Sequence, residues 1–202
     1  MTTYTVSGTI TAGGLGLAGA SVSDGTRSAI TASDGTYTIS AVPAGSYTLT
    51  PTKAGASFSP ATLAVEVVDA ALTGKDFNGY VTFMIGTSLV GLTDLMKLTQ
   101  PVPYPKSTYH PWSKPVALGD GSIRGLGWKT ITWFWKDLKP AEIEQLRTFC
   151  AGASAEVYIV TRQNVGDAFM AYKAVMIWPE EDRDFLRRMD IEFKFQRLEL
   201  QA

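Results

Sequence analysis

The N-terminal part of the chain alternates apolar and polar residues with the period of β-strands. The alternation is clear in four runs, Tyr4–Ile10, Thr36–Ile39, Tyr47–Thr50 and Leu63–Val67. Successive side chains of a strand point to opposite faces, so each run predicts a strand with one buried face. Turn sequences separate the runs, namely Gly13-Gly14, Asp24-Gly25, Asp34-Gly35, Pro43-Ala44-Gly45 and Lys53-Ala54-Gly55. This spacing predicts an antiparallel β-sandwich.

The second part of the chain begins with a passage that we expect to be a loop, Gly86–Pro115, which contains Pro101, Pro103, Pro105 and Pro111. Next comes Leu126–Trp135, which is rich in aromatic and β-branched residues. Such residues favour strands, and the Asp120-Gly121 pair before it is typical of a hairpin turn. We therefore predict that Leu126–Trp135 pairs with Pro115–Ile123.

A short helix is predicted over Lys139–Cys150. Pro140 stands at its first position, acidic residues follow in the first turn, and Ile143, Leu146 and Cys150 share one face. Lys139 stands where a Ser or Thr cap is expected, so the sequence defines the first residue of the helix less sharply. Three strands follow, at Ala155–Thr161, Phe169–Trp178 and Arg187–Leu200. The helix should lie on the sheet that these strands form.

Composition changes near Gly79. Residues 1–79 hold no tryptophan, whereas the remainder holds all five tryptophans and five of the six methionines. We predict two domains, residues 1–79 and 80–202, in a mainly β chain. The first is expected to be an immunoglobulin-like β-sandwich. The second is expected to be an antiparallel β-sandwich with one short helix.

The first domain carries a motif in which two turns are each followed by alternating aromatic and aliphatic residues. It reads Asp34-Gly35-x-Tyr37-x-Ile39 and then Pro43-Ala44-Gly45-x-Tyr47-x-Leu49. The domain thus resembles the carboxypeptidase-regulatory-like domains, a prealbumin-like module of many surface and virion proteins. The resemblance implies a spacer or adhesive role and brings no catalytic residues with it.

Several candidate sites have simpler interpretations. Gly14–Gly19 matches GxGxxG, but a dinucleotide site needs a helix next, and Ala20–Ser23 continues as strand, so we predict a hairpin loop. Asp24 and Asp34 are explained by Asp-Gly turns and lack the spacing of a calcium loop. We expect no metal and no cofactor.

Enzymatic chemistry also has little support in the sequence. His110 is the only histidine and lies in the proline-rich passage, where we expect it to pack or to contact a neighbour. Glu180, Glu181 and Asp182 are interpreted as a solvated charged turn. Cys150, the only cysteine, is expected to be a small core residue without a disulfide. We therefore predict that the protein is not an enzyme.

The five tryptophans leave two interpretations open. They either fill the core and a subunit interface, which we favour, or form a platform on which sugars stack. The formal charge of −1 gives no reason to expect specific binding to nucleic acid or to an anionic membrane. The N-terminus lacks the pattern of a secretory signal, so we expect the chain to stay in the cytosol unless a larger particle carries it out.

The second domain resembles small tail-associated proteins of long-tailed phages in its order of parts: an extended hairpin, a helix, then three strands. In tail tube and distal tail proteins, the resemblance implies rings of identical copies joined edge to edge and stacked into a channel. The expected partners are further copies, other tail proteins, DNA that passes without specific binding, and cell-surface glycans at the first domain. The expected location is the virion tail, with assembly in the host cytoplasm.

This hypothesis predicts which residues face a neighbouring copy. The interface residues that we expect are Tyr104, Tyr109, Trp112, Trp128, Trp133, Trp135, Arg188, Glu192 and Lys194. The alternative hypothesis is a monomeric surface-adhesion or carbohydrate-binding protein, in which the first domain is only a spacer.

Overall fold

A computed structural model describes residues 2–112, 114–118, 122–179 and 188–201. The chain divides into two compact units, and the boundary between them lies between Val81 and Thr82. This boundary is two residues beyond Gly79, where the composition changes. We refer to residues up to Val81 as unit 1 and to those from Thr82 as unit 2.

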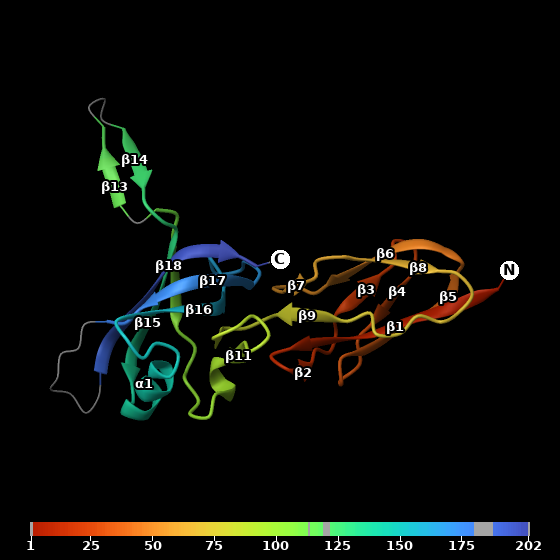
Figure 1. Cartoon of the computed structure of the whole chain (residues 1–202), viewed down its shortest axis with the longest axis horizontal. Helices are drawn as coiled ribbons and strands as arrows, with labels where there is room; N and C mark the ends of the chain where they lie inside the picture. Colours follow the sequence, from red (N-terminus) through yellow and green to blue (C-terminus); the bar gives the residue numbers. More distant parts are fainter. Residues whose placement is uncertain (1, 113, 119–121, 180–187, 202) are drawn as a thin grey trace. The chain divides into compact units, whose positions relative to one another are not determined.

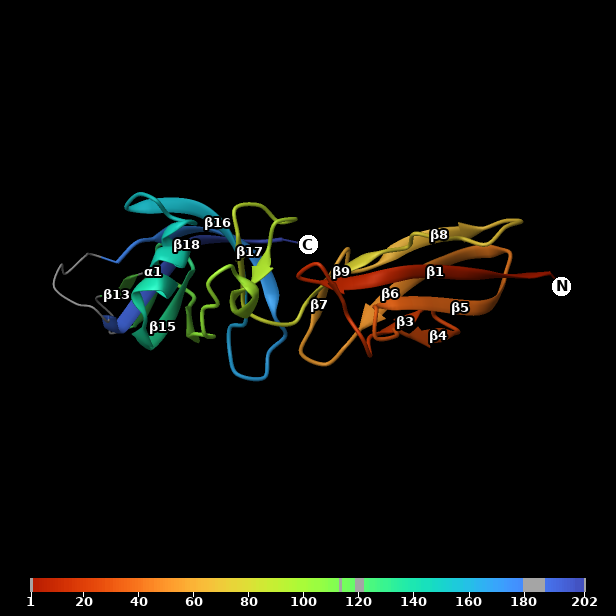
Figure 2. The same ribbon diagram turned by 90° about the horizontal axis from the view of Figure 1, so that it is seen from below.

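Unit 1 contains nine short strands in its described residues (Figures 1 and 2). Their bounds are β1 (Thr3–Ala12), β2 (Leu15–Gly16), β3 (Ser21–Ser23), β4 (Ser28–Ile30), β5 (Thr36–Pro43), β6 (Gly45–Thr52), β7 (Ser57–Ser59), β8 (Leu63–Val67) and β9 (Phe77–Tyr80). One sheet has the order β2-β1-β9-β7 with β5 also paired to β1, and the other has the order β4-β3-β6-β8. Residues such as Val6, Ile39 and Leu49 are fully buried between them. The four predicted strands and the β-sandwich are confirmed.

One strand pair differs from the antiparallel arrangement that we expected. β9 lies beside β1 and runs parallel to it, with Ile10 opposite Phe77. The preceding segment already follows β1, because the amide of Ser7 donates to the Leu72 carbonyl at 2.8 Å and the amide of Lys75 donates to the Ser7 carbonyl at 3.1 Å. The returning chain thus occupies an edge of β1 that would otherwise be unpaired.

Two of the motifs singled out in unit 1 have structural roles. Tyr37, the aromatic residue of the first turn motif, is buried, and its hydroxyl donates to the Lys75 carbonyl. Burial raises the pKa of this phenol to about 12. Gly13 and Gly14 both have positive φ in the turn between β1 and β2, and strand β3 follows the GxGxxG sequence, as predicted for a hairpin loop.

Asp24 closes the turn between β3 and β4. Its carboxylate accepts hydrogen bonds from the amides of Thr26 at 2.8 Å and Arg27 at 2.6 Å, and it pairs with the Arg27 guanidinium at 2.7 Å. Burial raises the pKa of the Asp24 carboxyl, but these hydrogen bonds and the guanidinium outweigh it and hold the pKa below its ordinary value. The charged form of the Asp24 carboxyl therefore stabilises the turn.

We expect Asp24→Asn to lower the stability of unit 1 at pH 7 by about 1 kcal/mol, because the ion pair is lost while the side-chain oxygen still accepts from the amides. A lowered pKa in the folded state stabilises the fold above roughly pH 4 and is lost as the pH falls through the folded-state pKa. The difference between wild type and variant should therefore vanish in acid. Thermal unfolding at pH 7 and at pH 2.5 measures it, and an equal difference at both values would contradict the ionic role.

Unit 2 contains the remaining strands and the single α-helix of the described chain. Their bounds are β10 (Met84–Gly86), β11 (Thr93–Asp94), the short 3₁₀ helix η1 (Leu95–Lys97), β12 (Lys106–His110), β13 (Lys114–Ala117), β14 (Ile123–Leu126), β15 (Thr130–Leu138), α1 (Pro140–Arg147), β16 (Ser154–Thr161), β17 (Met170–Ile177) and β18 (Arg188–Leu200). Seven of them form one antiparallel sheet in the order β11-β10-β16-β17-β18-β15-β12. The helix and the last three strands are confirmed, and the whole chain is mainly β.

This seven-stranded sheet curls over itself. In a flat sheet, β12 and β16 would lie four strand spacings apart, roughly 19 Å. The hydroxyls of Ser107 on β12 and Thr161 on β16 are instead 3.0 Å apart, and the indole N–H of Trp133 also donates to the Thr161 hydroxyl, at 3.2 Å. One continuous sheet thereby encloses the core as the two layers of a sandwich do.

Aromatic rings fill the curled sheet. Trp133 is fully buried and lies edge to face with Phe83, Trp135 and Phe195, at centroid distances of 5.8, 6.0 and 4.7 Å. The helix α1 covers part of this core with Leu146, and Cys150 just beyond it is buried as predicted. Burial also raises the pKa of the Cys150 thiol. The start of α1 is stabilised by Glu142, whose carboxylate accepts from the amide of Lys139 at 2.8 Å.

Two predictions in unit 2 were wrong in detail. The passage Gly86–Pro115 is not a loop throughout, since it contains β11, η1 and β12, and His110 is the last residue of β12. The strand expected over Leu126–Trp135 is interrupted at 127–129, so that Leu126 belongs to β14. We did not predict β12 because the prolines of this passage indicated a loop. They flank this edge strand and do not lie in it. The charged turn at 180–184 and the Asp120-Gly121 turn lie outside the described residues.

Candidate assembly surfaces

Trp133 and Trp135, which we expected at a subunit interface, lie inside unit 2. Both are buried, and the indole N–H of Trp135 donates to the Pro103 carbonyl at 2.7 Å. They are two residues apart on one strand, so both point to the same, inner face. The prediction that they face a neighbour was wrong for these two residues, which fill the core instead.

Tyr104 and Tyr109 also make contacts within the unit. The Tyr104 hydroxyl donates to the Asp94 carboxylate at 3.0 Å, and its ring lies 5.9 Å from the ring of Phe83. Burial, with the Asp94 carboxylate adding to it, raises the pKa of this phenol. Tyr109 packs partly buried against the core. These two rings therefore hold the passage around β12 to the body of the unit.

Glu192 and Lys194 lie exposed on the outer face of β18, opposite Phe134 and Thr132 of β15. On the same sheet, Lys173 pairs with Glu156 at 3.0 Å. The Arg188 side chain lies outside the described residues. The outer face of the sheet therefore carries charges of both signs and is available for polar contacts.

Strands β13 and β14 form a separate two-stranded hairpin that extends from the end of β12 and β15 (Figure 1). We call residues 111–129, as far as the structure describes them, the arm. Its register sets Lys114 opposite Leu126 and Ala117 opposite Ile123. A hairpin therefore lies in this region, but the predicted pairing of Leu126–Trp135 with Pro115–Ile123 was wrong, because β15 pairs with β12 and β18 instead. A two-stranded ribbon is marginally stable alone in water. The arm is thus an element that suits contact with another molecule.

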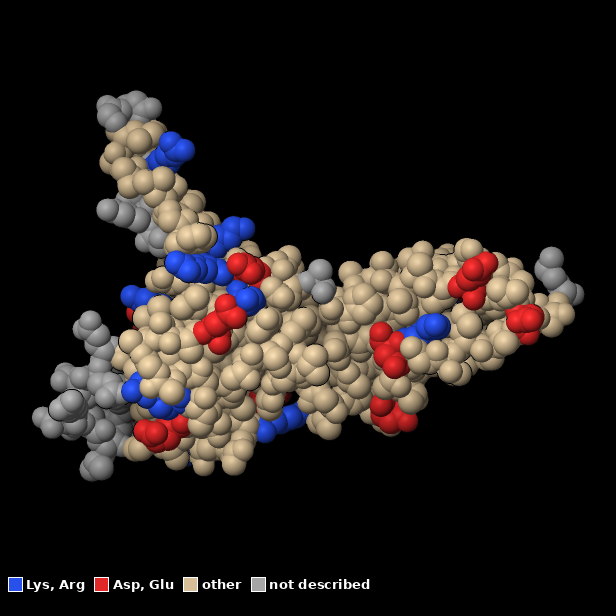
Figure 3. All heavy atoms as spheres, viewed as in Figure 1, with Lys and Arg blue, Asp and Glu red and all other residues tan. Residues whose placement is uncertain are grey.

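The arm presents apolar and basic side chains. Trp112 and Trp128 are 44% and 57% exposed, and Leu118 and Leu126 are exposed as well. Within residues 111–129 the sequence has three basic residues, Lys114, Arg124 and Lys129, and one acidic residue, Asp120. Figure 3 shows basic side chains on the arm and around its base. Such a combination is typical of a binding surface.

Both exposed tryptophans are held on one side. Trp112 lies against Gly125 of β14, where an added Cβ would come within 2.3 Å of its ring. Trp128 is covered by the Arg197 guanidinium, which lies 5.2 Å from the ring centroid. The first contact stiffens the arm, and the second ties its base to β18.

We expect Gly125→Ala to displace the Trp112 ring, because the methyl group cannot share its space. The tryptophan emission should shift to longer wavelength and become more accessible to acrylamide, while the stability of unit 2 changes by less than about 1 kcal/mol, since the site is exposed. Gly152→Ala is the matched control, because its Cβ would meet only one atom, at 3.8 Å. Unchanged emission in Gly125→Ala would show that the ring does not depend on this glycine.

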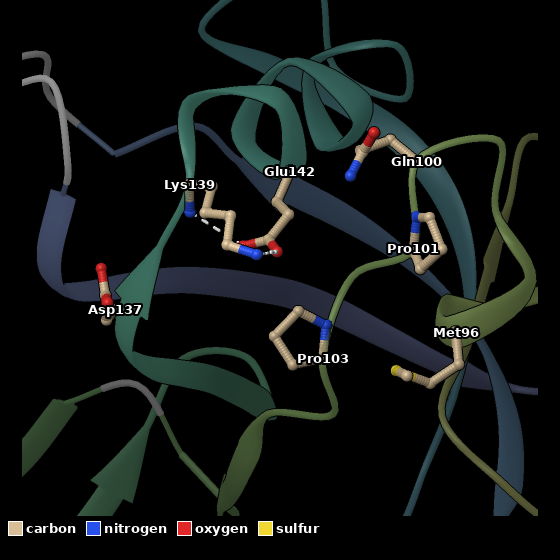
Figure 4. Close-up of a pocket in the computed structure, with 7 residues that line it drawn as sticks. All are labelled: Met96, Gln100, Pro101, Pro103, Asp137, Lys139 and Glu142. Carbon is tan, nitrogen blue, oxygen red and sulfur yellow. Dashed lines mark hydrogen bonds and ion pairs between the residues drawn. The ribbon is translucent and has the colours of Figure 1, made fainter.

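A shallow groove lies at the other end of β15, beside the start of α1. It has a volume of about 460 Å³ and is lined by Met96, Gln100, Pro101, Pro103, Asp137, Lys139 and Glu142 (Figure 4). The Lys139 ammonium lies 3.9 Å from the Glu142 carboxylate across it. We call this the α1 groove. It combines apolar walls with the ion pair of Lys139 and Glu142.

Among the residues that the structure describes, no cluster of three or more His, Cys, Asp or Glu side chains could hold a metal ion. Asp24 and Asp34, considered as calcium ligands, accept hydrogen bonds from backbone amides of their own turns. In the same part of the chain, no helix is long and apolar enough to span a membrane.

The family model that matches this chain covers most of unit 1 and the beginning of unit 2. A family model described as the β-sandwich domain of subunit 7 of the ER membrane protein complex matches residues 15–111, just under half of the chain. The match runs from β2 through β9 and on to β12. Unit 1 is an immunoglobulin-like β-sandwich. A search of curated proteins finds no match.

Among solved structures, one similar chain comes from a type II cohesin–X–dockerin complex of Acetivibrio cellulolyticus, described as an N-terminal interface mutant. It is 26% identical over 46% of this chain and 65% of that chain, with a TM-score of 0.31. This chain therefore spans less than two thirds of that chain. A TM-score this low does not establish a shared fold.

Proposed function

We propose that the protein is a structural component of a phage virion that forms oligomeric rings of the tail, as a tail tube protein or a closely related component. The observation that carries the proposal is the combination of an outer sheet edge at β12, which no strand covers in the described chain, with an apolar, basic arm beside it. Uncovered edges and exposed apolar ribbons favour pairing with another chain.

The order of parts supports the same function. The long hairpin of β12 to β15, the helix α1 and the three strands β16 to β18 follow one another in the order that we expect of a tail protein from the sequence. The free edge of β12 is five residues long, whereas the other end of the sheet, β11, has two. Copies would join through β12, which offers the longer row of backbone groups.

Unit 1 would be displayed on the outside of such a ring, as a module of the carboxypeptidase-regulatory-like type. The proposed partners are further copies of the chain, other tail proteins, DNA that passes through the channel without specific binding, and cell-surface glycans at unit 1. The proposed location is the virion tail, with assembly in the host cytoplasm. No catalytic role, cofactor or metal is part of the proposal.

Negative-stain electron microscopy of the purified full-length chain, with the mass measured by light scattering on the same sample, tests the proposal. Rings or tubes with knobs on the outer surface are the expected result. A particle that stays monomeric at every concentration, and remains so beside co-expressed tail proteins, would rule out ring formation.

The second candidate function is carbohydrate binding by a monomeric surface-adhesion protein, which the exposed faces of Trp112 and Trp128 favour. Binding to a glycan array that is lost in Trp128→Ala, in a protein that stays monomeric, would support it. Rings without glycan binding would support the tail function instead.

A further inference from the structure

Four exposed side chains gather where the arm meets the sheet. His110 at the end of β12 lies opposite Thr130 of β15, and Thr130 lies opposite Gln196 of β18, so the ends of these strands are adjacent. Lys129 precedes Thr130, and Arg197 follows Gln196. We call the four exposed residues the arm base: His110, Trp128, Lys129 and Arg197.

Arg197 has a backbone conformation that residues other than glycine rarely adopt. Its φ is +54°, and it lies in a β-bulge, where the pairing of β18 with Lys173 and Val175 of β17 changes register. Bulges re-aim side chains, and residues with such backbone strain gather at functional sites. Here the Arg197 guanidinium lies 5.2 Å from the centroid of the Trp128 ring. The fold thus keeps an unfavourable backbone conformation at the residue that holds this charge beside the exposed ring.

Within the described residues, neither cation of the arm base has a carboxylate partner. No ion pair joins Lys129 or Arg197 to an acidic side chain there. Glu199, the nearest acidic residue in sequence, lies opposite Lys173 on β17. Figure 3 shows basic side chains around the base of the arm, with acidic ones beside them. A guanidinium and an ammonium group next to an exposed ring suit a ligand that carries separate negative charges.

The surroundings of the arm base favour a sugar polymer over a nucleic acid. Duplex DNA carries one negative charge per about 1.7 Å of its axis. Phosphates at that spacing would also meet Glu192 and Glu199, which are exposed on β18. Single strands stack successive bases on several rings, whereas here Trp128 has one open face and Trp112 lies against Gly125. An acidic polysaccharide needs only one ring to stack on and one cation for each acidic group.

We propose that the arm base binds an acidic polysaccharide. One sugar ring stacks on the open face of Trp128, and its acidic group accepts hydrogen bonds from the Arg197 guanidinium and the Lys129 ammonium group. The imidazole of His110 donates to a hydroxyl group of the next sugar. The inference rests on the second candidate function, carbohydrate binding, and names the class of sugar and the residues that recognise its charge. It does not depend on ring formation.

Calorimetric titration of the full-length chain with a hexamer of galacturonic acid tests the inference. This probe carries a carboxylate on each sugar, and its methyl ester has the same rings without the charges. We expect the acid form to bind at least about tenfold more tightly than the ester, because the ester offers no carboxylate to the two cations. Binding of the acid form should weaken as salt is added.

Substitutions locate the binding site. Arg197→Gln and Lys129→Gln should each weaken binding of the acid form about three- to tenfold. Trp128→Ala should weaken it about tenfold or more, and Trp128→Phe should restore most of the loss, because a ring remains for stacking. Lys97→Gln is the matched control, since it removes an exposed positive charge from η1 and should change binding by less than about twofold. Unchanged unfolding midpoints would show that the variants remain folded.

The outcomes separate this inference from the functions on which it builds. No binding of the acid form, or equal binding of acid and ester, would overturn the inference, and binding of the ester through Trp128 would still support carbohydrate binding. Tighter binding of a twenty-nucleotide thymidine strand, lost in the same variants, would assign the arm base to nucleic acid instead. Rings that bind neither probe would leave only the tail function standing.

Discussion

Trp133→Ala should destabilise unit 2 by about 3–5 kcal/mol. The side chain is fully buried, and its removal leaves a cavity between Phe83, Trp135 and Phe195. It also removes the N–H that donates to Thr161, at the point where the curled sheet meets itself. Because all five tryptophans lie at Trp112 or beyond, urea unfolding followed by tryptophan emission reports on unit 2.

Trp128→Ala is the control for this experiment, because it deletes the same side chain at a position that is more than half exposed. We expect a loss of less than about 1 kcal/mol there. Equal losses in the two variants would mean that Trp133 does not fill the core. Trp133→Phe should lose less than Trp133→Ala, since a ring still fills most of the space.

Gly35→Ala should destabilise unit 1 by about 3 kcal/mol. The residue has a φ of +81°, which disfavours alanine by about 1–2 kcal/mol, and its added Cβ would come within 2.3 Å of the Ile10 carbonyl oxygen. Backbone cannot move aside as a flexible side chain does, so overpacking adds about 1–3 kcal/mol. Calorimetry of the full-length chain measures the change, and an unshifted tryptophan transition shows that unit 2 remains folded.

Gly14→Ala separates the two causes. Gly14 has nearly the same backbone conformation, with a φ of +76°, but an added Cβ would meet nothing within 4 Å. This control should therefore show only the conformational loss of about 1–2 kcal/mol. If both variants lost the same stability, the close approach of Gly35 to Ile10 would contribute nothing.

The strands of unit 1 could be predicted because turn chemistry and alternation agree there. The turn motif at Asp34-Gly35 is explained by the contacts of Gly35 and Tyr37, both of which depend on residues far away in the sequence. Position 16, within the GxGxxG match, requires glycine because an added Cβ there would come within 2.0 Å of the Asp34 carbonyl oxygen. The sequence could exclude a nucleotide site, but it could not reveal this crossing of two turns.

Unit 2 was harder to predict for a physical reason. Aromatic residues have the same pattern whether they face the core or a partner, so Trp133 and Trp128 were assigned together although one is buried and the other exposed. The curl of the sheet decides between them, and it depends on a contact between Ser107 and Thr161, 54 residues apart. The α1 groove likewise joins residues from two distant segments, and no local motif marks it.

The parallel course of β1 and β9 determines how unit 1 responds to mechanical force. Because the first and last strands run the same way, the chain enters the unit at one end of this strand pair and leaves at the other. A pull on both ends acts along the strands, in shear, on the hydrogen bonds that join β1 to the segment from Leu72 to Asn78. These bonds must break together and not one after another, so the unit should resist stretching more strongly than a hairpin that unzips.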